Sequence, residues 1–277
     1  MTAPLPLTPG RVLALALGVP LALAMIAWAG LTEVALAGQD TYPVRLAVPV
    51  HGGTVSLSAG PANLRVKQGA GSRLRLTGTA RYSIVRSTVT WHTSRSGVTL
   101  TPQCRFPVGV CTFNFTAVLP EGKRARVSVG SSDLTLQGLS GPVVAGSGSG
   151  DVRAELLTGA VSLQDGSGDI SGTTLSGPRV TLKDGSGDIA IGGLSGGHVV
   201  ASDVSGDIAL TFSKVPSLVQ VNDSSGNVTL VLPPGSTRYR VNASTASGSS
   251  SVTVPTSAAS PDVITVTNSS GDISITN

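Results

Sequence analysis

The sequence predicts an all-β chain whose larger part is a β-solenoid of two-strand coils of about 18–23 residues. Three observations predict it: a Ser-Gly-Asp phrase that recurs along the C-terminal half, a second turn sequence between its occurrences, and strands in which apolar residues alternate with polar or small ones. Repetition at a spacing of this length is typical of stacked repeats. Alternation with a period of two is typical of half-buried strands.

The Ser-Gly-Asp phrase marks the first turn of each repeat, and its spacing grows from 18 to about 23 residues along the chain. Glycine takes a positive φ without a steric penalty, and an Asp or Ser side chain can accept a hydrogen bond from the backbone two residues on. We therefore expect the repeated aspartates to be structural turn residues. They are Asp133, Asp151, Asp169, Asp188, Asp207 and Asp272.

A second turn follows each of the first four aspartates, because a leucine comes six residues later and begins a Leu-Ser-Gly or Leu-Thr-Gly sequence. These leucines are Leu139, Leu157, Leu175 and Leu194. Two turns and two strands in each repeat describe one flattened coil, and like strands of successive coils stack about 4.8 Å apart. Roughly eight coils would give a rod on the order of 40 Å long.

Stacked Gly-rich turns with aspartates can also bind calcium in a parallel β-roll. In that repeat Asp follows a Gly-x-Gly-x pattern with a period of nine, whereas here Asp169 directly follows the second glycine of Gly-Ser-Gly. The Leu-Ser-Gly-Pro turn also has no carboxylate. A calcium-stiffened β-roll is thus the less favoured alternative, and we expect no cofactor and no metal site.

The N-terminal region contains 21 residues without a charge, from Val12 to Thr32. As a helix they would extend about 32 Å, close to the roughly 30 Å of a bilayer core. The apolar stretch of a cleavable signal is shorter. The sequence therefore predicts a transmembrane signal-anchor helix over residues 12–32, after a short cytoplasmic tail of residues 1–11.

The charges around this stretch predict that the rest of the chain is extracytoplasmic. Arg11 precedes the stretch, and the first basic residue after it is Arg45, so the positive-inside rule leaves the N-terminus in the cytoplasm. The small residues of Ala35-Leu-Ala37 resemble a cleavage site. Secretion after cleavage near Ala37 is therefore the alternative to a single-pass membrane protein.

Residues 38–130 predict less regular strands, such as Val44–Val48 and Leu64–Val66, and contain most of the aromatic residues. We expect this region to cap the solenoid of residues 131–277, since the open end of a solenoid needs a cover. Cys104 and Cys111 lie beyond the predicted span, where oxidation is permitted. They predict a disulfide that closes a short loop and contributes roughly 2.5 kcal/mol; a metal pair or a catalytic thiol is the less favoured alternative.

Charge is divided between these two regions. Residues 38–130 hold 12 Lys or Arg against two acidic residues, and residues 131–277 hold six against 12. The basic region could attract anionic lipid head groups or anionic wall polymers. The alternative is that its arginines only fill the solvent faces of alternating strands. Nucleic acid is a poor partner, because few aromatic residues accompany the basic ones.

The residues that catalysis would need are sparse. His51, His92 and His198 are the only histidines, and none belongs to a metal-binding or nucleophile motif. We expect no enzyme activity and no catalytic residue.

Together these features resemble the bacterial "putative adhesin" family of β-strand repeats, a domain of unknown function found in exported and membrane-anchored proteins. The resemblance rests on the Ser-Gly-Asp-Val/Ile repeats from Asp133 to Asp272, the Leu-Ser-Gly-Pro turns, and the order of anchor, irregular strands, Cys104/Cys111 loop and repeats. It covers roughly residues 40–277 and implies an envelope protein with a β-solenoid and no established activity.

The functional prediction is a membrane-anchored, extracytoplasmic surface for adhesion, binding or scaffolding in the bacterial cell envelope, with an envelope polymer or an envelope protein as its partner. The alternative is an envelope-stress sensor or regulatory ectodomain that works through a membrane partner. The strand Ile273–Ile275 has no visible cap after it. We therefore expect its edge to permit self-association.

Overall fold

The computed structural model describes residues 18–30, 38–94, 97–105 and 110–277. The chain divides into two compact units. The first consists of Met1–Tyr42, Ala80–Thr88 and Gln103–Thr112, and the second of Pro43–Thr79, Val89–Pro102 and Phe113–Asn277. Twenty-three strands lie in the described residues and form two sheets.

The first sheet, sheet A, has 12 strands. In spatial order they are β1 (Gln39–Pro49), β4 (Arg73–Ser83), β7 (Cys111–Pro120), β3 (Asn63–Gly69), β9 (Leu134–Gln137), β11 (Val152–Leu157), β13 (Ile170–Leu175), β15 (Ile189–Leu194), β17 (Ile208–Phe212), β19 (Val228–Val231), β23 (Ile273–Thr276) and β21 (Ser250–Val252).

The second sheet, sheet B, has 11 strands. In spatial order they are β20 (Arg240–Ser247), β22 (Val263–Ser270), β18 (Leu218–Ser225), β16 (His198–Ser202), β14 (Arg179–Lys183), β12 (Val161–Gln164), β10 (Val143–Gly146), β8 (Arg124–Ser128), β2 (Thr54–Ser58), β6 (Gly97–Gln103) and β5 (Thr88–Ser94).

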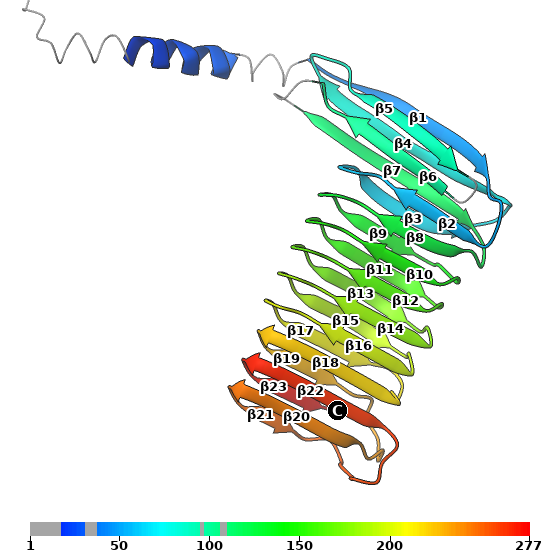
Figure 1. The fold of residues 1–277 in the computed structure, drawn as a ribbon, viewed down its shortest axis with the longest axis vertical. Helices are drawn as coiled ribbons and strands as arrows, with labels where there is room; N and C mark the ends of the chain where they lie inside the picture. Colours follow the sequence, from blue (N-terminus) through cyan, green and yellow to red (C-terminus); the bar gives the residue numbers. More distant parts are fainter. Residues whose placement is uncertain (1–17, 31–37, 95–96, 106–109) are drawn as a thin grey trace, which may run out of the picture. The chain divides into compact units, whose positions relative to one another are not determined.

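The prediction of two-strand coils is confirmed, because successive strands from β8 to β19 alternate between sheet B and sheet A. Each strand pairs in parallel with its equivalent in the neighbouring coils (Figure 1), and the register is fixed by the repeat: Val152 lies opposite Leu134 on one side and Ile170 on the other. The pairing continues across residue 130, since β2 pairs with β8 and β3 with β9. Parallel sheets are typically covered on both faces; here each sheet covers one face of the other and turns its second face to solvent.

The core consists of aliphatic columns between the two sheets. One column of sheet A and its counterpart in sheet B are buried to 2 % exposure or less: Leu134, Val152, Ile170, Ile189, Ile208, Val228 and Ile273, with Val143, Val161, Val180, Val199, Val219 and Ile264. Burial of each such side chain stabilises the fold by about 1.5–3 kcal/mol relative to exposure.

The last two coils are stacked in the reverse of their chain order. Strands β22 and β23 pair with β18 and β19, and β20 and β21 pair with the other side of β22 and β23. Figure 1 shows the red coil between the yellow and orange ones. The prediction that Ile273–Ile275 forms the open edge is therefore wrong, since β23 has a partner on each side and β20 and β21 form the edges.

A helix over residues 18–30 is the described part of the predicted span; residues 12–17, 31 and 32, and the candidate cleavage site at Ala37, lie outside the described residues. Within the described ranges, no helix has both the length and the apolar character that crossing a bilayer requires.

Candidate functional site

Ten side chains form one hydrogen-bonded column along sheet A, which we call the exposed ladder. Each member lies at or just before the first residue of its strand, except Asn114, which lies within β7. Its members are Asn114, Asn63, Asp133, Asp151, Asp169, Asp188, Asp207, Asn227, Asp272 and Ser249. The side-chain Nδ2 of Asn63 donates to the Oδ1 of Asn114 at 3.1 Å. From Asp133 onward, the backbone N–H of each member donates to the side-chain Oδ1 of the preceding member, at 2.7–3.3 Å. The ladder therefore ties each coil to the next.

All six predicted turn aspartates lie in this ladder, at the turns where they were expected, and they are exposed. The expected bonding pattern is wrong. Their Oδ1 atoms accept from the neighbouring coil and not from the backbone two residues on, because the flat turns bring equivalent N–H groups within reach. At Asp272, hydrogen bonds from the backbone N–H and the hydroxyl of Ser249 lower the pKa of the carboxyl.

A second row of aspartates, the buried column, lies four residues before the ladder in the same turns. It consists of Asp165, Asp184, Asp203 and Asp223, which are at most 7 % exposed. Their Oδ1 atoms accept N–H groups of their own turn; the N–H groups of Gly166, Gly185 and Val204 each lie at 2.6 Å. The local turn-closing role that the sequence assigned to the ladder belongs to these residues.

The other carboxylate oxygen of each buried aspartate, Oδ2, is inaccessible to solvent and accepts no hydrogen bond. Burial disfavours the charged form, so it raises the pKa of all four carboxyls, that of Asp184 to about 6. The neighbouring carboxylates Asp165 and Asp203 raise the pKa of Asp184 further.

Neutral residues take this position in other coils, among them Asn268. Asn268 occupies the buried column between Asp223 and the end of the stack, since β22 pairs with β18 in register at these two residues. Its Nδ2 donates to the carbonyl of Gly226 in the neighbouring coil at 2.7 Å. The amide of Asn268 therefore has a hydrogen-bond partner in the neighbouring coil, whereas the Oδ2 of each buried aspartate has none.

The glycine of the Ser-Gly-Asp phrase is required by the stacking distance. A Cβ at Gly187 would lie 2.1 Å from the carbonyl oxygen of Gly168 in the preceding coil. Real Cβ atoms do not approach backbone oxygens so closely. A Cβ at the equivalent glycine of each other coil would also meet backbone atoms of a neighbouring coil. The repeated phrase thus reflects the close approach of successive turns.

The outer face of sheet B is hollowed where small residues follow one another. Two adjoining hollows of about 610 and 210 Å³ share Val144 and Ser162 as lining residues. Together we call them the sheet-B hollow. Its cationic lining is Arg124, Arg126 and Arg179, and no Asp or Glu is among the described residues that line it. The single ion pair in the described part of the chain joins Arg153 and Glu155 on sheet A.

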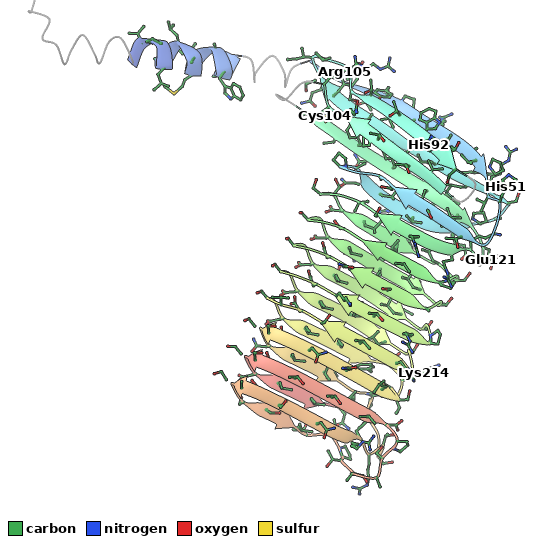
Figure 2. The ribbon with its side chains drawn as sticks, in the orientation of Figure 1. His51, His92, Cys104, Arg105, Glu121 and Lys214 are labelled. Carbon is green, nitrogen blue, oxygen red and sulfur yellow. A yellow bond between two sulfur atoms is a disulfide. The ribbon has the colours of Figure 1, made fainter. Side chains whose placement is uncertain are left out.

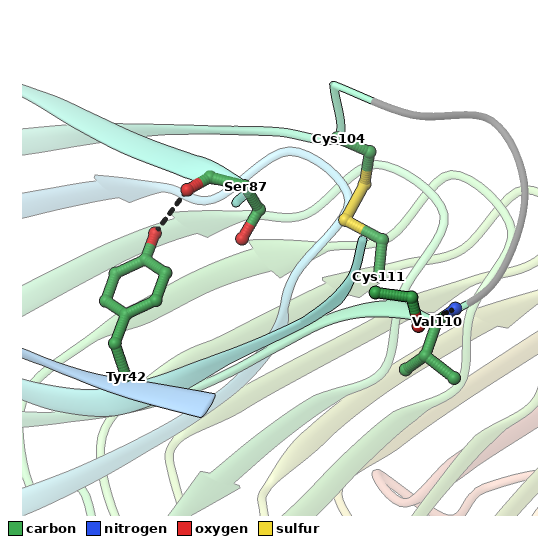
Figure 3. Close-up of a disulfide and its surroundings, with 6 residues drawn as sticks. Tyr42, Ser87, Cys104, Val110 and Cys111 are labelled. Atoms are coloured by element: carbon green, nitrogen blue, oxygen red, sulfur yellow. Dashed lines mark hydrogen bonds between the residues drawn. A yellow bond between two sulfur atoms is a disulfide. The ribbon is translucent and has the colours of Figure 1, made fainter. Parts of the chain in front are cut away.

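The predicted disulfide is confirmed. Cys104 and Cys111 are bonded, with Cα atoms 6.0 Å apart, in the first unit. Figure 3 shows the bond beside Val110, whose N–H donates to the Oγ of Ser83 at 3.0 Å. Nearby, the hydroxyl of Tyr42 donates to the carbonyl oxygen of Ser87 at 3.0 Å.

The histidines occupy separate, exposed positions. Figure 2 labels His51, in the turn before β2, and His92, on β5; His198 begins β16. In the described residues there is no group of three or more His, Cys, Asp or Glu that could hold a metal ion. The ladder carboxylates contribute one residue per turn and already accept N–H groups, so the geometry lends no support to a calcium-stiffened roll.

Comparison with known proteins identifies the family. A search of curated proteins finds no match. The family model of Toastrack DUF4097 matches residues 118–276, more than half of the chain. The chain belongs to the Toastrack DUF4097 family.

Comparison with solved structures finds several that are similar to this Toastrack chain. A protein from Parabacteroides merdae described as a putative adhesin is 11 % identical, with a TM-score of 0.51 over 85 % of this chain and 96 % of that one. Another described as a putative adhesin, from Bacteroides fragilis, is 11 % identical over 85 % and 97 % of the two chains, with a TM-score of 0.41. One from Parabacteroides distasonis described as a putative lipid binding protein is 11 % identical over 85 % and 96 %, with a TM-score of 0.43. The resemblance to the adhesin-named repeat family is confirmed at the level of family and fold.

Proposed function

We propose that this Toastrack protein is a non-catalytic binding protein of the bacterial cell envelope, and that its sheet-B hollow holds an anionic polymer. The observation that carries the proposal is the lining of the hollow: three arginines and no carboxylate, on a chain whose repeats are otherwise acidic. Arginine is well suited to carboxylate and phosphate groups, because its planar guanidinium can donate two parallel hydrogen bonds.

The shape of the hollow suits an extended ligand. Arg126 lies opposite Val144 in the next strand, Val144 opposite Ser162, and Ser162 opposite Thr181. This row crosses neighbouring strands about 4.8 Å apart and has the exposed Val144 and the hydroxyl side chains of Ser162 and Thr181 beyond its arginine. A linear polymer could therefore lie across the strands with anionic groups at the arginines and hydroxyl groups along the row. The name "putative adhesin", carried by proteins of this fold, agrees with a binding role.

We also propose that residues 12–32 anchor the chain in the membrane, with residues 38–277 extracytoplasmic. The exposed apolar surface of helix 18–30 supports this: Leu21, Ile26 and Trp28 are each more than 60 % exposed. A helix that is apolar on all sides is stable in an apolar surrounding. The mass of the mature protein distinguishes this anchor from secretion after cleavage near Ala37.

Binding of poly(glycerol phosphate) to the full chain tests the polymer site. The double variant Arg124→Ser, Arg126→Ser should lose about tenfold or more in affinity, because each arginine loses a charged hydrogen bond. The matched control is Arg65→Ser, Lys67→Ser, which removes the same charge from exposed positions of β3 on sheet A. Isothermal titration of both variants provides the measurement. An equal loss of affinity in the control would show that net charge, and not the position of the arginines, causes the loss. Absence of binding by the unmodified chain would refute the polyanion site.

A further inference from the structure

The first unit presents two exposed apolar side chains side by side in the turn that follows β4. Ile84 is 44 % exposed and Val85 is 40 % exposed, and the exposed Arg86 follows them. We call residues 84–86 the apolar loop. Single exposed apolar residues are ordinary. Exposure alone therefore does not mark this pair as a binding site, and its conformation and position are the relevant evidence.

The conformation of the apolar loop is one that isoleucine disfavours. The N–H of Val85 donates to the carbonyl of Ser83 at 2.6 Å, which closes a three-residue γ-turn with Ile84 at its centre. The φ of Ile84 is 61°, in the left-handed region. A β-branched residue there is an outlier, and glycine would fit without strain. Such strain concentrates at binding and switch sites.

The loop is held by its neighbours within the first unit. The Oγ of Ser83, just before the loop, accepts the N–H of Val110 beside the disulfide (Figure 3). At the end of the loop, the Arg86 guanidinium carbon lies 4.4 Å from the centre of the Tyr42 ring, a cation–π contact. Ile84 and Val85 therefore project from a turn whose flanking residues, Ser83 and Arg86, are held by these two contacts.

The position of the loop relates it to the N-terminal apolar stretch. The N–H of Ile84 donates to the carbonyl of Gly38 at 3.5 Å. Gly38 follows Thr32, the last residue of the uncharged stretch, by six residues. Six residues span at most about 20 Å. If residues 12–32 lie in a bilayer, the backbone of Ile84 lies within about 25 Å of its surface, whatever path the intervening residues take.

We propose that the apolar loop is a second membrane contact, in which Ile84 and Val85 enter the boundary between head groups and acyl chains. This inference rests on the proposed membrane anchor. Tyr42 and Tyr82 lie beside the loop with their rings 6.1 Å apart, and tyrosine rings are typical of the head-group level. The exposed Arg81, Arg86 and Arg105 outnumber Asp40 in the described residues of this unit, which suits lipid phosphates.

Three versions of the full chain, each with one tryptophan, test this in phosphatidylcholine vesicles that contain brominated lipid. The first is Trp91→Phe, which leaves Trp28 as a probe of the anchor. The second and third combine Trp28→Phe and Trp91→Phe with either Val85→Trp or Val204→Trp. Val204 is 56 % exposed in the second unit, in the turn between β16 and β17, and provides the matched control.

The expected result is a blue-shifted emission of Val85→Trp that is quenched by lipids brominated near the head group, with Val204→Trp unquenched. Quenching of Trp28 without quenching of Val85→Trp would overturn the apolar-loop contact and leave the anchor intact. An unquenched Trp28 would overturn the anchor, and with it the loop contact unless Val85→Trp is quenched by itself. Quenching of Val204→Trp equal to that of Val85→Trp would also overturn the contact.

The variant Ile84→Gly separates lipid contact from folding. It relieves the left-handed strain and removes an exposed side chain, so the melting temperature should rise by about 2 °C or more. In the Val85→Trp background it should reduce the lipid quenching. A fall in melting temperature would show that Ile84 is there for stability, which would overturn the proposal.

Discussion

The two aspartates that flank the Gly-Ser-Gly turn of residues 185–187 are the same residue in nearly the same place, yet they act in opposite ways. Asp188, in the exposed ladder, accepts the N–H of Asp207 in the next coil and keeps its other oxygen in water. Asp184, in the buried column, accepts N–H groups of its own turn and buries an oxygen that has no donor.

The difference shows that the position of a carboxylate within a turn decides whether its charge favours folding. A ladder carboxylate stays hydrated and gains a hydrogen bond between coils. A carboxylate of the buried column gains a local bond but loses hydration, and its equivalents above and below add repulsion. Five predictions test this comparison.

The largest effect is expected from the triple variant Asp184→Asn, Asp203→Asn, Asp223→Asn. At pH 7.5 it should raise the free energy of unfolding by about 3–5 kcal/mol, because it removes three buried charges and supplies amide donors. Asn268 shows that an amide at this position finds a carbonyl to bond. Urea denaturation provides the measurement.

The same variant should remove most of the acid stabilisation of the native chain. The folded-state pKa of Asp184, about 6, is above its ordinary value. Its contribution is therefore fully present below about pH 3.8 and is lost as the pH rises through about 6. From pH 7.5 to 5 the unmodified chain should gain about 1 kcal/mol or less from this site. Asp151→Asn, Asp169→Asn, Asp188→Asn in the ladder is the control and should keep the gain; a gain retained by the buried-column variant instead would refute the assignment.

The converse substitution Asn268→Asp should destabilise the chain by about 2–3 kcal/mol at pH 7.5. It replaces the donor to Gly226 by an acceptor and extends the row of buried charges. Part of the loss should be recovered at pH 5, where a carboxylic acid can donate in place of the amide. Denaturation at both pH values measures this, and an equal loss at both would show that charge is not the cause.

A single break in the ladder should have a smaller effect. Asp169→Ala removes the acceptor for the N–H of Asp188 and should cost about 1 kcal/mol. Asp169→Asn keeps an acceptor oxygen, as Asn63 and Asn227 do elsewhere in the ladder, and should cost less than half as much. Equal losses in urea denaturation would mean that the charge of Asp169, and not its hydrogen bond, ties the coils.

The smallest effect concerns Asp272, whose pKa is lowered by hydrogen bonds from Ser249. The sign is opposite to that of the buried column: this contribution is present above pH 3.8 and is lost as the pH falls through the lowered pKa. Carboxyl NMR titration should find Asp272 below 3.8, and Ser249→Ala should move it upward. A value at or above 3.8 in the unmodified chain would contradict the ladder geometry at this coil.

The sequence was sufficient to predict the period, the two strands of each coil and the disulfide, because each depends on local alternation or on chain proximity. It also contained an unused signal for the buried column. Asp165 follows Val161 and Leu163 at intervals of two, so it continues their inward alternation, whereas Asp169 immediately precedes the inward Ile170. The period of two, carried one step into the turn, separates the two kinds of aspartate.

Neither the coil order nor the sheet-B hollow could be predicted in this way. The coils that contain β20 and β22 have similar apolar patterns, and Val263 can face Leu218 while Arg240 faces Val263 without any mismatch in the alternation. No local sequence pattern indicates which of these two coils lies next to β18. The hollow depends on residues brought together from four strands, β8, β10, β12 and β14, of which the sequence shows only separate arginines and small residues.

The reversed order of the last two coils affects how the stack can form during synthesis, when the chain emerges with its N-terminus first. Strands β20 and β21 arrive before their only neighbours, β22 and β23, exist. Until residues 263–276 follow, the earlier coil has no template beside it, and β18 and β19 keep open edges. Residues 263–276 pair with β18 and β19 on one side and with β20 and β21 on the other, so they complete both coils at once. Coils elsewhere in the stack can be added one at a time, whereas these last two must form together.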